Sequence, residues 1–161
     1  MQRIDGVSLI EAFDAEKVRA SAGKEVTIEA CVHKIREMSS FAFVILRTAN
    51  DLIQAIYEED KCKVKLSEIK VGMYVRAVGY IRTDERAILG FELTLKDIEI
   101  LSKPAAEYPL NVAHKKLGCG LEANLDNRSV ALRNPNEKAI FKVQEGVVSG
   151  FREFLEGQGF T

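Results

Sequence analysis

The sequence contains no tryptophan, and only three cysteines, three prolines and two histidines occur among its 161 residues. Three is an odd number of cysteines, and the spacing of Cys31, Cys62 and Cys119 fits no zinc-binding pattern. Because His33 and His114 are the only histidines that could add nitrogen ligands, we predict that the chain holds no metal. Free thiols without a disulfide framework are typical of a reducing compartment, so we expect a cytoplasmic protein.

Long hydrophobic runs and an excess of one charge are also missing. No stretch approaches the roughly 18 apolar residues that a membrane-spanning helix needs, and the N-terminus has no signal-peptide core. We therefore expect a soluble protein that does not use a membrane as a partner. The formal net charge of -1 excludes nucleic-acid binding by bulk positive charge. Any RNA contact must then come from a local basic patch and specific side chains.

From Val26 onward, apolar and polar residues alternate with a period of two, which predicts half-buried β-strands. Five such segments occur, and the connector between the third and the fourth is longer and includes a short helical segment at 66–69. This layout is that of an OB-fold, a mainly β, five-stranded Greek-key barrel, although other small barrels share the strand count. The expected strands run from Val26 to about Arg36 and over Phe41–Arg47, Leu52–Tyr57, Tyr74–Ile81 and Phe91–Ile100.

The expected barrel occupies residues 25–102 and has segments of other character on either side. Residues 1–24 form a lead-in with a weak helical signal, carried by Leu9, Ile10, Phe13 and Val18. Prolines and glycines interrupt residues 103–133, which show no period and therefore read as a hinge or linker.

Residues 134–161 have the pattern of one amphipathic helix. Asn134 suits the N-cap, Pro135 the first helical position, and Glu137 would complete a capping box. Apolar residues then recur at three- and four-residue steps, which predicts an apolar stripe that needs a covering partner. The stripe consists of Ile140, Val143, Val147, Phe151 and Phe154.

The second expected strand carries the most informative side chains. If Ala42, Val44 and Leu46 face the barrel interior, Phe41 and Phe43 face outward, where OB-folds bind oligonucleotides and aromatic rings stack on bases. Patterning alone leaves the opposite orientation equally open. Neither reading places a nucleophile, acid and base together, so we expect no catalytic residues.

Three polar side chains accompany these rings. Gln54 lies in an apolar strand, and its amide suits the Watson–Crick edge of a base, although a solvent-facing polar residue is the commoner explanation. Glu92 is expected to alternate outward, either as an acceptor for base N–H groups or as a solvated surface acid. Arg36 belongs to a basic rim for phosphates, which could also be merely solvated. The other arginines of this rim are Arg47, Arg76, Arg82 and Arg86.

Longer stretches resemble a known family. EVTIEACVHKIR at 25–36, FAFVILR at 41–47 and LIQAIY at 52–57 are similar to the anticodon-binding domain of eukaryotic/archaeal-type aspartyl-tRNA synthetases, which are class II enzymes. Residues 125–161, beginning LDNRSVALRN, resemble the hinge of that family and the helix that opens its motif 1. The resemblance implies an OB-fold that binds the anticodon loop of an aspartate-accepting tRNA.

The resemblance also implies roles for the four side chains. Phe43 matches the aromatic residue that stacks on an anticodon base, and Gln54 matches the amide that reads the central uridine. Arg36 matches a basic contact to the anticodon loop, and Glu92 matches an acid near the other anticodon bases. These four are the predicted RNA-binding residues.

The arginines of class II motifs 2 and 3, which hold ATP in the family, have no counterpart in this sequence. We therefore expect no cofactor and no aminoacylation from this chain, although its parent would be a homodimer that uses ATP and magnesium. Three alternatives remain at this point: the equivalent domain of an asparaginyl- or lysyl-tRNA synthetase, an OB-fold that docks a partner protein, and a general single-strand binder.

Overall fold

The computed structural model describes residues 3–4, 7–8 and 15–161. The chain divides into two compact units, Met1–Glu107 and Tyr108–Thr161. The first unit begins with two short paired strands, β1 (Arg3–Ile4) and β2 (Val7–Ser8), followed by helix α1 (Ala15–Ala20). Of the predicted lead-in helix, Leu9, Ile10 and Phe13 lie outside the described residues, whereas Val18 lies in α1 and is buried.

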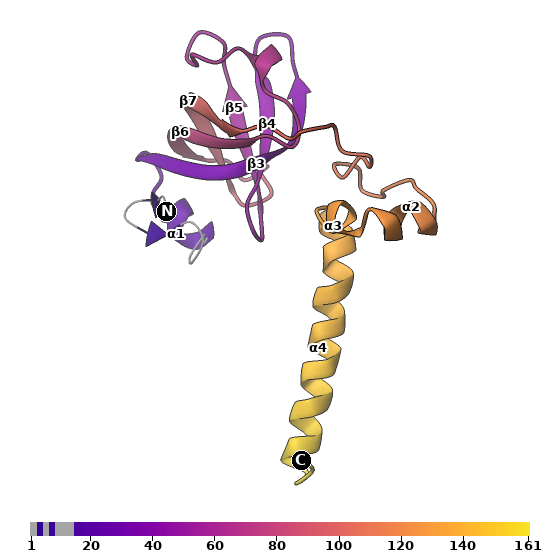
Figure 1. Ribbon diagram of the computed structural model, residues 1–161. Coiled ribbons are helices and arrows are strands. Elements are labelled where there is room, and N and C mark those ends of the chain that lie inside the picture. The colour runs from indigo at the N-terminus through magenta and orange to yellow at the C-terminus, as the bar shows by residue number, and fades with distance from the viewer. Residues whose placement is uncertain (1–2, 5–6, 9–14) are drawn as a thin grey trace. The chain divides into compact units, whose positions relative to one another are not determined.

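Five strands of the first unit form a closed barrel (Figure 1). The order around the barrel is β3-β4-β5-β7-β6, and every pair is antiparallel except β5 and β7, whose parallel contact closes the barrel. The 3-10 helix η1 (Leu66–Glu68) lies in the connector between β5 and β6. The architecture confirms the predicted mainly β, five-stranded OB-fold. The strands are β3 (Glu25–Glu37), β4 (Ala42–Arg47), β5 (Leu52–Tyr57), β6 (Tyr74–Thr83) and β7 (Phe91–Ser102).

Alternate residues of each strand fill the barrel interior, as the period of two predicts. Val26, Ile28, Ala30 and Val32 of β3 are each 2% exposed or less, and the partners on the other strands are equally buried. Burying one such aliphatic side chain is worth roughly 1.5–3 kcal/mol, so this interior is the main source of stability. The barrel in turn fixes which side chains point outward.

A glycine permits a close backbone approach between β6 and β7. The pairing of β6 with β7 shifts register between Val78 and Gly79, and a Cβ added to Gly79 would lie 2.2 Å from the Thr94 carbonyl oxygen. No side chain fits at that distance, so glycine at this position lets the two strands stay paired across the irregularity.

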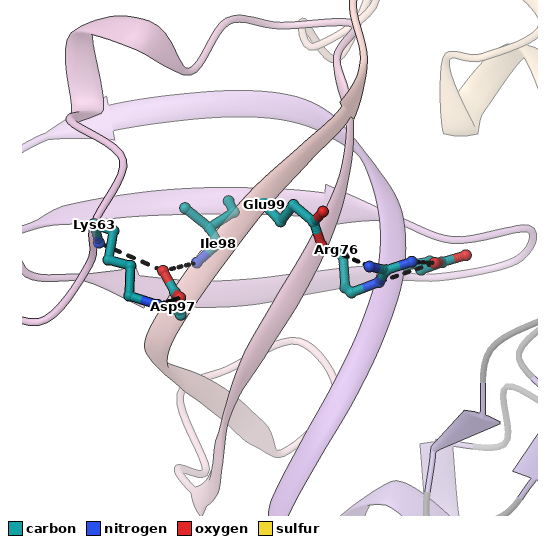
Figure 2. A network of polar contacts seen from close by, with 6 residues as sticks. Lys63, Arg76, Asp97, Ile98 and Glu99 are labelled. Atoms are coloured by element: carbon teal, nitrogen blue, oxygen red, sulfur yellow. Dashed lines mark hydrogen bonds and ion pairs between the residues drawn. The ribbon is translucent and has the colours of Figure 1, made fainter.

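The outer surface of β3, β6 and β7 carries charges that pair across strands. Register places Glu29 opposite Arg76, and Arg76 opposite Glu99. The Arg76 guanidinium lies 3.1 Å from a Glu29 carboxylate oxygen and 2.6 Å from one of Glu99 (Figure 2). Lys63 pairs with Asp97 on the same part of the barrel, at 3.2 Å (Figure 2). We call this surface the ion-paired face.

The second unit contains three helices, α2 (Leu121–Asp126), α3 (Arg128–Ala131) and α4 (Pro135–Gly157). The first two lie in the segment predicted as a linker. They are too short to produce a readable helical period, because a helix of six residues completes fewer than two turns. In the described part of the chain, no helix is long and apolar enough to cross a membrane.

Asn134 begins α4 as predicted, but the capping box does not form. The Asn134 side-chain oxygen accepts from the backbone N–H groups of Asn136 (2.9 Å) and Glu137 (3.3 Å), while its amide donates to the carbonyls of Val112 and His114. The carboxylate of Glu137, instead of turning back to the cap, bonds to Asn124 and Arg128. Asn134 is 1% exposed, so this buried amide uses both of its ends.

The end of α4 and its surface follow the sequence closely. Gly159 has a φ of 85° and the N–H of Phe160 bonds to the Leu155 carbonyl, which is the Schellman arrangement. The predicted apolar stripe is exposed along α4, with Val143, Val147 and Phe151 each at least 66% exposed.

Candidate nucleic-acid interface

The orientation of β4, which the sequence left open, is settled by burial. Ala42, Val44 and Leu46 are at most 1% exposed and face the barrel interior. The alternate residues therefore face outward, and the rings of Phe41 and Phe43 lie half-buried on the outer surface. The two rings meet edge to face, with centroids 5.1 Å apart and planes at 89°. This outer surface of β4 and β5 is the face on which OB-folds bind single strands.

Arg36 connects the aromatic ring to the amide. It lies opposite Phe43 in the β3–β4 pairing, and its guanidinium carbon is 5.0 Å from the centroid of the Phe43 ring. The same guanidinium donates a hydrogen bond of 3.3 Å to the side-chain oxygen of Gln54. A guanidinium over an aromatic face is attracted by the ring quadrupole, so the contact orients both groups.

Glu92 does not behave as the solvated surface acid that alternation suggested. It is 6% exposed, and its neighbours Phe91 and Leu93 are also buried. The Gln54 side-chain nitrogen donates a short hydrogen bond to a Glu92 carboxylate oxygen. A buried carboxylate needs such partners because its desolvation is costly. The Glu92 side chain therefore lies on the outer side of the barrel, where it lines a groove, but it is buried and not exposed to solvent as a surface acid would be.

The four predicted RNA-binding residues form one connected group, although they come from four different strands. Arg36 lies on β3, Phe43 on β4, Gln54 on β5 and Glu92 on β7. The contacts run from the ring to the guanidinium, from there to the amide, and from the amide to the carboxylate. We call these four residues the reading cluster.

An open groove of about 660 Å³ lies next to the reading cluster and includes two of its members. Its lining contains five carboxylate side chains and two guanidinium groups, so the groove favours hydrogen-bond donors over phosphate. The Arg86 guanidinium donates to both carboxylate oxygens of Asp84 and holds the pKa of Asp84 down, at about 2. The lining residues are Ser40, Phe41, Phe43, Ile56, Glu58, Glu59, Asp60, Arg82, Asp84, Arg86 and Glu92.

The predicted basic rim is only partly present. Arg82 and Arg86 line the groove beside Phe43. Arg76 was wrongly included, because it lies on the ion-paired face and is engaged by Glu29 and Glu99. Arg47 lies at the far end of β4 with its Nε buried, and no partner for that atom is found among the residues that the structure describes.

The acidic side of the groove was not predicted from the sequence. Glu58, Glu59 and Asp60 belong to the connector between the third and fourth expected strands, to which no role was assigned, yet they line the groove. They follow directly after β5, the strand that carries Gln54. Their position immediately after that strand was the available signal.

His33 in β3 is a buried polar group to which the sequence assigned no role. It sits at the register shift between Val32 and Lys34 and is 4% exposed. Burial, followed by the charges of Arg47 and Lys34, lowers the pKa of His33 to about 4. Nothing in the described part of the chain bonds to its Nδ1. The ring is therefore kept neutral at physiological pH.

Comparison with known proteins agrees with the fold. Residues 26–101 match the model of a tRNA anticodon family that is described as an OB-fold nucleic acid binding domain. The match begins in β3 and ends in β7, so it covers the barrel and the whole reading cluster.

Relatives extend the likeness beyond the barrel. The chain is 32% identical to the aspartate–tRNA(Asp/Asn) ligase of Archaeoglobus fulgidus over 94% of its own length, and 34% identical to that of Methanococcus maripaludis over 86%. It spans about a third of the length of these relatives (36% and 32%). The asparaginyl-tRNA synthetase structure from Pyrococcus horikoshii shares the fold, with a TM-score of 0.74 at 24% identity, over 93% of this chain and 36% of that one.

Proposed function

We propose that the chain recognises the anticodon loop of an aspartate-accepting tRNA. Residues 26–101 match a tRNA anticodon family described as an OB-fold nucleic acid binding domain, and most of the chain is similar to aspartate–tRNA(Asp/Asn) ligases. The observation that carries the proposal is the reading cluster. It joins an outward aromatic ring, a guanidinium, an amide and a carboxylate on the face where OB-folds bind single strands.

Each member of the reading cluster has a chemical role in this proposal. The Phe43 ring stacks on an unpaired base, which is worth about 1–3 kcal/mol in single-strand binders. Gln54 pairs with the central uridine through its amide. Arg36 contacts the anticodon loop, and Glu92 accepts from base N–H groups at the groove. The acidic groove supports base recognition, whereas phosphates would meet Arg36 and the rim arginines.

A titration with anticodon stem-loops tests the proposal. The chain is titrated with a stem-loop bearing GUC and with one whose central U is replaced, at low and at moderate salt. We expect tighter binding to GUC and a loss of that preference in Gln54→Ala. Thr27→Ala serves as a matched control, because Thr27 is a half-buried polar residue of β3 in the part paired with β6.

The outcomes separate the alternatives. Equal binding to both stem-loops would contradict base reading and favour a general single-strand binder. No binding at low salt, by a chain that is folded, would contradict the proposal as a whole. Binding that does not depend on salt would argue against phosphate contacts and for a protein-docking surface.

The relatives suggest that the chain also binds a second tRNA, the one that accepts asparagine. Both relatives described above are named as ligases for aspartate and asparagine tRNAs. Gln54 cannot separate these tRNAs if it reads the central base that they share. We therefore propose that the chain accepts both, and stem-loops that differ only in the third anticodon base test this directly.

We further propose that the chain acts within a larger cytoplasmic aspartate–tRNA ligase, a homodimer that uses ATP and magnesium. The homology to ligases about three times as long supports this. The 161 residues contain no counterpart of the motif 2 and motif 3 arginines, so we expect them to support no aspartate-dependent ATP–pyrophosphate exchange. Exchange above background by the purified chain would contradict this expectation.

A further inference from the structure

The amide of Gln54 is held at both ends before any ligand arrives. Its oxygen accepts from the Arg36 guanidinium, and its nitrogen donates to the Glu92 carboxylate. A glutamine amide has two acceptor positions on oxygen and two N–H donors. One acceptor position and one N–H therefore remain for a ligand.

The two neighbours allow only one orientation of this amide. A guanidinium can only donate hydrogen bonds, so the atom facing Arg36 must be the oxygen. A carboxylate can only accept, so the atom facing Glu92 must be the nitrogen. Turning the amide over would set two donors against each other on one side and two acceptors on the other. The orientation thus follows from the hydrogen-bonding chemistry of the two neighbours.

Uracil and cytosine differ in the feature that such an amide detects. At position 4 uracil carries an acceptor oxygen, while cytosine carries a donor amino group. At position 3 the roles reverse, since uracil carries N–H and cytosine an acceptor nitrogen. An amide that pairs with one of these edges must be turned over to pair with the other. A freely turning glutamine would therefore accept both pyrimidines.

We propose that Arg36 and Glu92 are positioning residues that lock the Gln54 amide in one orientation, and that this lock makes the cluster select uracil over cytosine. The inference rests on the proposed function, because it assumes that Gln54 faces a base.

Both sides of the lock are themselves held in place. Glu92 is 6% exposed within β7, at a position paired with Arg82 of β6. Arg36 is exposed, but its guanidinium lies over the Phe43 ring, 5.0 Å from the centroid. The ring that would stack on a base therefore also steadies the group that orients the amide. Stacking and base selection are coupled through one guanidinium.

The test compares dissociation constants for stem-loops bearing GUC and GCC. Variants Arg36→Gln and Glu92→Gln each replace a group that only donates or only accepts with an amide that does both, so each removes one side of the lock. The double variant removes both sides and makes either orientation of Gln54 acceptable. The wild-type chain should prefer GUC by roughly tenfold or more. Each single variant should lower that ratio, and the double variant should bring it to within about threefold of one, because GCC binding improves relative to GUC.

Arg36→Lys is the matched control, because lysine also only donates. Its affinity for both stem-loops should fall, while the GUC to GCC ratio stays close to that of the wild type. A merely structural role for Arg36 would change affinity and melting temperature without changing the ratio. Loss of the ratio in Arg36→Lys to the same degree as in Arg36→Gln would contradict the lock.

The failure of this inference is distinct from failure of the proposed function. If the wild-type chain binds neither stem-loop, the function itself is wrong. If it prefers GUC and the Arg36→Gln/Glu92→Gln double variant keeps the full preference, only the lock is wrong. Should the double variant fail to fold, as circular dichroism would show, the exposed Arg36→Gln and Arg36→Lys pair decides the question: a lower GUC to GCC ratio in Arg36→Gln supports the lock, and equal ratios contradict it.

Discussion

The two outer faces of the barrel arise from the same alternation of strand residues, yet their polar groups are used differently. On the ion-paired face, Arg76 reaches a carboxylate on each neighbouring strand, and both ion pairs are partly solvent-exposed. On the other face, the Glu92 carboxylate is buried and bonds to the neutral amide of Gln54. On the ion-paired face, each charged group is neutralised by a partner of opposite charge. On the other face, the Gln54 amide that bonds to the Glu92 carboxylate still has a donor and an acceptor position for a ligand.

The comparison teaches that residue composition does not separate a stabilising face from a recognising one. Both faces carry arginine, glutamate and aromatic residues, including Tyr74 and Tyr80 on β6. Cross-strand register makes the difference, since it places Glu29 beside Arg76 but Phe43 beside Arg36. The following predictions test this separation, beginning with the largest effect.

The largest effect is expected where β6 and β7 meet. In Gly79→Ala the new methyl group would lie 2.2 Å from the Thr94 carbonyl oxygen, so the strands must separate. We expect a loss of about 3 kcal/mol in the free energy of unfolding, measured by urea denaturation. Gly146→Ala in α4 is the control, because nothing lies within 4 Å of its added Cβ and alanine favours a helix. An unchanged midpoint for Gly79→Ala would show that the close approach is not required.

The second prediction concerns the pH dependence of stability. His33 lies buried in β3, the strand that pairs with both β4 and β6. The folded state disfavours protonation of His33, with a pKa near 4, while the unfolded chain protonates near 6.5. The unfolded state therefore binds the extra proton in this window, so stability is full above pH 6.5 and is lost as the pH falls towards 4. The expected loss is roughly 2–3 kcal/mol.

Denaturation curves between pH 7 and pH 4 would measure this loss. His33→Gln has no group that titrates in the window, so its stability should change less over the same range. Identical pH profiles for the wild type and the variant would show that His33 is not the group responsible.

The reading cluster should affect binding rather than stability. Phe43→Ala removes the stacking ring from a half-buried outer position, and we expect a loss of about 1–3 kcal/mol in binding free energy for the GUC stem-loop. Tyr80→Ala is the matched control, because it removes a 43% exposed aromatic ring from the outer surface of β6. Fluorescence anisotropy gives both values. An equal loss in the two variants would break the distinction between the faces.

The smallest effect is expected from the ion pairs. Arg76→Gln removes two contacts that are partly solvent-exposed, so the free energy of unfolding should fall by less than about 1 kcal/mol, and less still at high salt. Stem-loop binding should not change. A clear loss of RNA affinity in Arg76→Gln would show that Arg76 contacts RNA after all, as the sequence-based hypothesis of a basic rim proposed.

The sequence was sufficient for the barrel and for the members of the reading cluster, but not for how they contact one another. Alternation identified the buried faces of β3 and β6, because burial on one side of a strand leaves a period of two, but it left the orientation of β4 open. It could not show that Glu92 is buried, because the Gln54 amide that bonds to its carboxylate lies on another strand. Arg76 was misplaced for a similar reason, since its partners depend on register.

Short-range rules failed in the second unit where a distant residue offered a better partner. Glu137 has the correct spacing for a capping box, yet Arg128 and Asn124 bind its carboxylate. The helices α2 and α3 were missed because each is shorter than two turns. The beginning of α4 was predictable because Asn134 caps it through atoms only two and three residues away.

The same cap is protected from one common route of chemical damage. Spontaneous deamidation of asparagine begins when the backbone nitrogen of the next residue attacks the side-chain carbonyl. Asn134 is followed by Pro135, whose nitrogen bears no hydrogen, and the Asn134 amide is buried with both ends engaged. Conversion to aspartate would replace two donated hydrogen bonds with a carboxylate facing the carbonyls of Val112 and His114. The Asn134 amide, which connects the start of α4 to the carbonyls of Val112 and His114, should therefore stay intact even in protein that is stored or slowly turned over.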